Sequence, residues 1–137
     1  MKYTSKPYYS DLTIPQQCQE ISINLKNNAL VFQGRFQGKY QASVAANGQP
    51  YWTSKDNAMW LLDGTNWAIG TLQNFGKNDV ELFSRSKHLS PYGKKSQWVY
   101  HNRKEWKLAK PDDIEITCTM KAGESVFSTS YILNIEF

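Results

Sequence analysis

The feature that most constrains the fold is a series of short aromatic segments, separated by tight-turn residues, between residues 38 and 70. Asn47-Gly48 and Asp63-Gly64 supply the positive φ angles of hairpin turns, whereas aromatic and β-branched side chains fit the pleated surface of a strand. The large rings of this stretch are Tyr40, Tyr51, Trp52, Trp60 and Trp67. The pattern predicts a compact antiparallel β unit.

The same alternation of strand and turn signals extends over most of the chain. Turn residues recur about every eight to twelve residues, a spacing typical of β-sandwiches and β-barrels. The expected strands are residues 20–25, 30–36, 40–44, 50–53, 58–62, 67–71, 97–101, 105–108, 114–118 and 126–137, with 97–101 and 105–108 as the two arms of a hairpin. Residues 73–95 are expected to be the least regular part, around one short apolar piece over residues 80–83. Gly34, inside one of them, is expected to mark a bulge or a close backbone approach. No stretch predicts a helix.

Length and composition favour one domain. A chain of 137 residues with 40% hydrophobic and 14% aromatic residues can bury a core of its own. We therefore predict an all-β fold, a single compact sandwich or barrel of mostly antiparallel short strands over residues 18–137, preceded by an extended arm or linker over residues 1–17. No apolar run approaches the roughly 20 residues of a membrane span.

The two cysteines bear on the cellular compartment. Cys18 and Cys118 each lie near the outer end of an alternating strand, so a bridge between them would join the beginning of the domain to its end. A disulfide would place the protein outside the cell or at the cell surface. The alternative is a pair of buried free thiols in a cytoplasmic protein. The first residues contain no apolar signal-peptide core, which fits a cytosolic protein or a processed fragment.

The order of residues between the cysteines resembles an aromatic-rich, disulfide-closed all-β module of secreted multidomain proteins. The resemblance covers about 100 residues and is carried by Cys18 before Ile21 and Ile23, Gly38-Lys39-Tyr40, Asn47-Gly48-Gln49-Pro50-Tyr51, Trp60, Trp67-Ala68-Ile69-Gly70, Pro91, Trp98, Trp106 and Ile114-Glu115-Ile116-Thr117-Cys118. It implies an extracellular interaction module and transfers no functional residue.

Residues for catalysis or metal binding do not form a recognisable motif. The two histidines, His88 and His101, have no Gly-x-Ser-x-Gly nucleophile motif to accompany them, and most carboxylates fall in predicted turns. We expect no metal, no cofactor and no enzymatic activity. A small hydrolase with an unrecognised site stays an alternative.

Aromatic rings among polar and basic side chains are the remaining signal. A flat ring on a β scaffold can stack on a sugar face while neighbouring side chains bond the hydroxyl groups. The candidate ligand-binding residues are Tyr51, Trp52, Trp98, Trp106 and Lys104. The leading hypothesis is a non-enzymatic, lectin-like recognition module. A structural or assembly domain that binds another protein is the alternative, and a net charge of only +4 argues against nucleic acid.

Overall fold

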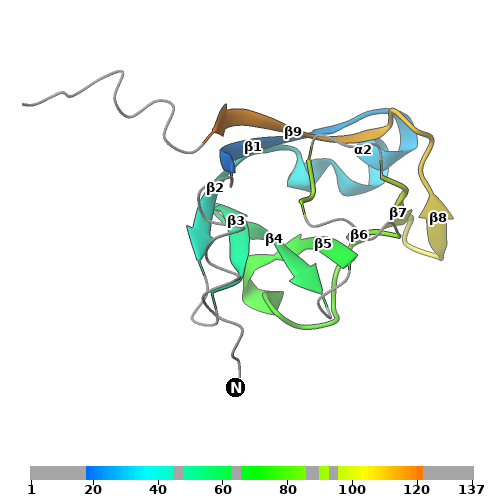
Figure 1. The fold of residues 1–137 in the computed structure, drawn as a ribbon. Helices are drawn as coiled ribbons and strands as arrows, with labels where there is room; N and C mark the ends of the chain where they lie inside the picture. Colours follow the sequence, from blue (N-terminus) through cyan, green and yellow to red (C-terminus); the bar gives the residue numbers. More distant parts are fainter. Residues whose placement is uncertain (1–17, 45–47, 63–65, 86–89, 93–95, 122–137) are drawn as a thin grey trace, which may run out of the picture.

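The protein folds into one curled antiparallel sheet (Figure 1). The structure, a computed structural model, describes residues 18–44, 48–62, 66–85, 90–92 and 96–121. Its strands are β1 (Cys18–Leu25), β2 (Gly38–Val44), β3 (Pro50–Ser54), β4 (Asn57–Leu62), β5 (Asn66–Thr71), β6 (Leu82–Ser84), β7 (Trp98–His101), β8 (Trp106–Leu108) and β9 (Ile114–Lys121). Their order is β8-β7-β6-β5-β4-β3-β2-β1-β9, so β1 to β8 form a meander and β9 returns to β1. The all-β prediction is confirmed.

Most expected strands are present with small shifts of their ends, whereas two expectations lie outside the described residues. These are the extended arm over residues 1–17 and the last strand over residues 126–137. The expected hairpin near the end of the meander is confirmed, since β7 and β8 pair with Tyr100 opposite Lys107.

The strand expected over residues 30–36 is wrong, and so is the absence of helices. Residues Asn27–Gln33 form the α-helix α2, Gly34–Phe36 form the 3-10 helix η1, and Leu72–Asn74 form the 3-10 helix η2. Ala29 and Gln33 are the buried residues of α2, and their spacing of four places them on one helical face. Gly34 has a right-handed helical backbone, so it marks no bulge.

Helix α2 lies between the two ends of the curled sheet. Its Gln33 side chain donates from Nε2 to the backbone oxygen of His101 in β7, at 2.6 Å, and the Phe32 ring stacks with Tyr100 at a centroid distance of 6.4 Å. The backbone N–H of Lys26, at the start of α2, donates to the Asp113 oxygen just before β9. The helix therefore joins the β1–β9 side of the sheet to the β7 side (Figure 1).

The main core fills the inside of the curl. Aliphatic side chains of β1 and β9 meet rings from β2, β3, β5 and β7 there. The largest fully buried side chains are Trp52, Trp67, Tyr40, Phe36, Ile21 and Ile23. The buried polar atoms of two of these rings have partners, because the Tyr40 hydroxyl donates to the Phe36 oxygen and the Trp52 Nε1 donates to the Cys18 oxygen. Burial raises the pKa of Tyr40.

A disulfide joins Cys18 in β1 to Cys118 in β9, as one of the two sequence alternatives predicted. The two Cα atoms are 5.8 Å apart. In the register Cys118 is opposite Ile21 and Cys18 is opposite Lys121, with an irregularity at Glu20 between these two pairs. The bridge joins residues 100 positions apart, for which loop-closure entropy alone predicts up to about 4.7 kcal/mol of stabilisation.

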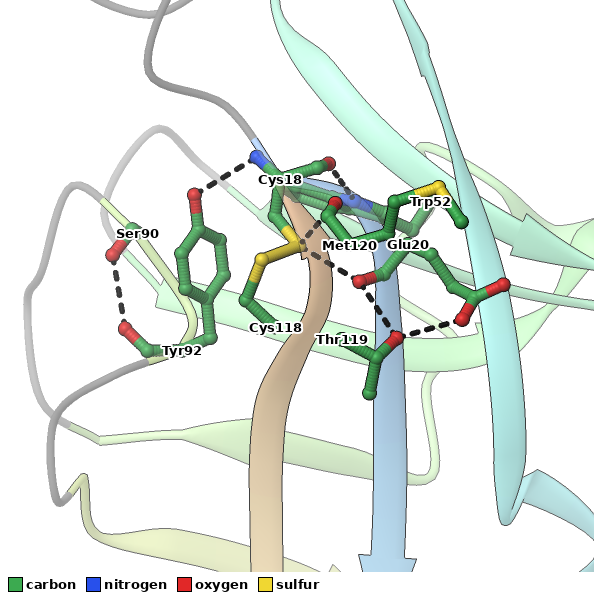
Figure 2. The surroundings of a disulfide bond; sticks show 8 residues. All are labelled: Cys18, Glu20, Trp52, Ser90, Tyr92, Cys118, Thr119 and Met120. Carbon is green, nitrogen blue, oxygen red and sulfur yellow. Dashed lines mark hydrogen bonds between the residues drawn. A yellow bond between two sulfur atoms is a disulfide. The ribbon is translucent and has the colours of Figure 1, made fainter. Parts of the chain in front are cut away.

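Cys18 is also held by its backbone (Figure 2). Its N–H donates to the Tyr92 hydroxyl at 3.0 Å, and its carbonyl accepts from the Trp52 indole at 2.8 Å. The Ser90 hydroxyl donates to the Tyr92 oxygen, which supports the segment that carries the ring. The disulfide sulfurs have no proton to donate, so the approaches of Cys18 Sγ to the oxygens of Glu20 and Met120 are contacts. One end of β1 is thus attached to β3, β9 and the segment before β7.

Candidate recognition surface

The structure separates the five candidate residues into two groups. Trp52 and Trp98 are only 1% and 3% exposed, so the expectation that these two rings face a ligand is corrected. Trp52 packs edge-on against Trp67 and Tyr92, inside the curl. Successive strand residues alternate between faces, and in β3 the inward position falls on Trp52. Tyr51 is the member of that pair on the outer face.

A separate cluster of apolar side chains, which we call the outer cluster, covers the outside of β3 to β6. It consists of Ala58, Trp60, Ala68 and Val80 with the partly buried Tyr51, Leu62, Phe75 and Phe83. The Phe75 ring lies between Tyr51 and Trp60, at centroid distances of 4.4 and 5.5 Å. Gly70 allows this packing, because a Cβ there would lie 3.1 Å from the Trp60 ring. The Tyr51 ring is therefore packed within the outer cluster and does not form a free platform for a ligand.

Trp106 continues the row of rings beyond the outer cluster. Its indole makes edge contacts with Phe83, at 5.0 Å and 70°, and with His101, at 5.1 Å and 85°. Even so, Trp106 is 44% exposed, and Leu108, two residues further along β8, is 54% exposed. We call Trp106, Phe83, His101 and Leu108 the Trp106 platform.

The register explains why these four residues share one face. Phe83 is opposite Val99, Val99 is opposite Leu108, and His101 is opposite Trp106. Directly paired residues of antiparallel strands point to the same face, as do residues two apart in one strand. The Trp106 platform thus lies on the outer face of β6, β7 and β8, on the other side of the sheet from the main core.

The turn between β7 and β8 positions polar groups beside the Trp106 platform. Asn102 Oδ1 accepts hydrogen bonds from the backbone N–H groups of Lys104 and Glu105, both at 2.9 Å. His101 Nδ1 accepts from the Arg103 N–H at 3.0 Å. Lys104 is exposed in this turn, two residues from Trp106. The structure therefore brings Trp106 and Lys104 onto one hairpin and leaves Tyr51 in the outer cluster, three strands from β6.

Catalytic and metal-binding chemistry gains no support from the described residues. Among them, no group of three or more His, Cys, Asp and Glu side chains is arranged to hold a metal ion. Both cysteines are joined in the disulfide, so neither offers a thiolate nucleophile. Within the same residues, no helix has the length and apolar character needed to cross a membrane.

Sequence reasoning missed three of the four residues of the Trp106 platform. Phe83, His101 and Leu108 were not among the candidate binding residues, although the two-residue alternation within β7 and β8 carried a signal for His101 and Leu108. Phe83 belongs to a three-residue strand within an irregular region, where no alternation can be read. No family model, no curated protein and no solved structure matches this chain, so the geometry alone supports a functional proposal.

Proposed function

We propose that this protein is a non-enzymatic extracellular recognition module that binds carbohydrate on the Trp106 platform. The observation that carries the proposal is the indole of Trp106, which is almost half exposed yet is held by edge contacts with Phe83 and His101. A ring fixed before binding loses little conformational entropy when a ligand stacks on it. Its apolar face suits the C–H groups of a pyranose ring.

The polar groups nearby suit the rest of a sugar. Lys104 can donate to hydroxyl groups, and the Asn102 side chain fixes the turn that carries it. The disulfide supports an extracellular location, because such bonds persist mainly in oxidising compartments. No specific observation favours hydrolase activity.

A glycan array probed with the full chain tests the proposal. We expect the wild-type chain to bind at least one class of glycan and Trp106→Ala to lose at least tenfold in affinity for it. Trp106→Phe, which keeps a flat ring, should retain part of the binding.

The matched control is Leu72→Ala, because Leu72 is an apolar residue of similar exposure, 41%, on η2. Its affinity should equal that of the wild-type chain. Absence of binding to every glycan, or equal loss in Trp106→Ala and Leu72→Ala, would contradict the proposal.

A further inference from the structure

Strand β8 is an edge of the sheet, and its hydrogen-bond pattern leaves one side of its backbone open. Asn102 N–H donates to the Glu105 oxygen, and Ala109 N–H donates to the Trp98 oxygen. Bonded and non-bonded pairs alternate along antiparallel strands, so Tyr100 and Lys107 form the bonded pair between these two. The backbone N–H and C=O groups of Trp106 and Leu108 therefore point away from β7. Within the described residues, β7 is the one strand paired with β8.

The side chains of β8 alternate in chemistry as well as in direction. Trp106 and Leu108 are exposed apolar residues on the outer face, whereas Lys107 shares the opposite face with its partner Tyr100. The Lys107 ammonium lies 3.6 Å from the Glu105 carboxylate, and both side chains are at least half exposed. An exposed ion pair of this kind is worth little, so Lys107 can exchange it for another carboxylate at small cost.

Lys107 also disfavours self-pairing of this edge. Two copies of β8 related by a twofold axis at their central residue would place one Lys107 directly opposite the other. Like charges in that position destabilise a strand pair, and lysine on an edge strand is a common protection against aggregation. A carboxylate opposite Lys107 would reverse the sign of this interaction.

We infer that β8 binds an extended segment of a partner protein in which one acidic residue lies between two apolar residues. The backbone of the segment would pair with the open N–H and C=O groups of Trp106 and Leu108, as in β-strand addition. Its acidic side chain would lie next to Lys107, and its two apolar side chains would lie on the outer face beside Trp106 and Leu108. The exposed Lys104 and Lys110 nearby add attraction for an acidic segment.

This interaction shares Trp106 with the proposed carbohydrate binding but depends on two further features that the glycan does not use. The glycan requires the face of the Trp106 ring, whereas the peptide requires the open backbone of β8 and the Lys107 charge on the other face of the sheet. Lys107→Glu therefore separates the two functions. It should abolish binding of the acidic peptide and leave glycan affinity unchanged.

Fluorescence anisotropy with two labelled peptides tests the inference on the full chain. One peptide has a central Val-Glu-Val run between threonines, and the other has Val-Lys-Val in the same frame. We expect the Glu peptide to bind at least tenfold more tightly to the wild-type chain and Lys107→Glu to reverse this preference. Lys77→Glu is the matched control, since it makes the same charge change at an exposed residue away from β8 and should keep the wild-type preference.

Amide hydrogen exchange locates the bound peptide. The Glu peptide should slow exchange at the Trp106 and Leu108 amides, while Lys107, whose N–H bonds to β7 in either state, should change less. Binding of neither peptide, or equal effects of Lys107→Glu and Lys77→Glu, would overturn the inference. Self-association of the wild-type chain that Lys107→Glu removes in sedimentation would assign the edge to a second copy and also overturn it.

Discussion

At the scale of single residues, position relative to the curl decides what each aromatic side chain does. Trp52 and Tyr51 are neighbours of similar size, yet the first is buried in the main core and the second lies in the outer cluster. The sequence could predict that they point to opposite faces but not which one points inward, because the outer face of β3 to β6 is also covered. Trp106 was predicted as a candidate ligand-binding residue and lies at the surface. Its contacts with Phe83 and His101 could not be predicted, because they depend on the pairing register of β6, β7 and β8, which the sequence does not show.

Lys55 is a residue whose backbone conformation is unfavourable. It is the first of two residues that join Ser54 to its partner Asn57, and its φ of 33° lies in the left-handed region. Glycine is preferred at the first position of such two-residue turns because it has no Cβ. We expect Lys55→Gly to raise the free energy of unfolding by about 0.5–1 kcal/mol, after the entropy that glycine adds to the unfolded chain.

Chemical denaturation at neutral pH measures this change. Lys77→Gly serves as the control, because Lys77 is exposed and its φ is not positive, so glycine there should give no gain. Equal or lower stability of Lys55→Gly would show that the turn carries no such strain.

Glu20 makes stability depend on pH. Gln41 Nε2 donates to one of its carboxylate oxygens at 2.8 Å, the Thr119 hydroxyl donates to the other at 2.7 Å, and Lys39 lies 3.9 Å away. These hydrogen bonds, and to a smaller extent the Lys39 charge, lower the pKa of Glu20 below its ordinary 4.5. The carboxylate thus connects β1 to its neighbours β2 and β9.

Because the folded-state pKa is lowered, this stabilisation is present above pH 4.5 and is lost as the pH falls through the folded-state pKa. We expect Glu20→Gln to be less stable than the wild-type chain at pH 7 and the difference to shrink as the solution becomes more acidic. Denaturation of both proteins at a series of pH values checks this. A difference that stays constant with pH would show that the Glu20 charge does not contribute.

At the scale of elements, the strands could be predicted and the helix could not. Strand positions follow from short aromatic and β-branched runs between turn residues, and these local signals agree with the fold. Residues 30–36 carry the same local signal, with Leu30, Val31 and Phe32 in succession, yet all of them fold as α2 and η1. Tertiary contacts override weak local preference here, because the helical spacing places Gln33 against β7 and Ala29 in the main core.

Gln33 is the residue whose side chain hydrogen-bonds α2 to β7, beside the stacking of Phe32 on Tyr100. It is 3% exposed, and its Nε2 donates to the His101 oxygen. Gln33→Ala would leave a buried carbonyl without its donor and a space under the helix. We expect a loss of about 2 kcal/mol in the free energy of unfolding.

The comparison for this loss is Gln73→Ala, at an exposed position in η2, which should change stability by less than about 0.5 kcal/mol. Thermal and chemical denaturation of the two variants give both values. A loss in Gln33→Ala no larger than that in Gln73→Ala would mean that α2 does not hold the two sides of the sheet together.

At the scale of the whole molecule, the disulfide, the β1–β9 pairing and α2 act together. They hold the first and last described strands and the β7 region around one core, and this keeps the sheet curled (Figure 1). The curl buries Trp52, Trp67 and Trp98 in the main core, the outer cluster covers Trp60, and Trp106 stays on the outer face near an edge. The proposed binding surface therefore results from the same geometry that forms the core.

Site-resolved tryptophan oxidation, followed by mass spectrometry, measures which tryptophan rings are accessible and whether a glycan covers Trp106. Limited oxidation should modify Trp106 much faster than Trp52, Trp60, Trp67 and Trp98, and a glycan selected from the array should slow oxidation of Trp106 alone. Oxidation of Trp52 or Trp98 at the rate of Trp106, or glycan binding that leaves Trp106 unprotected, would contradict the account.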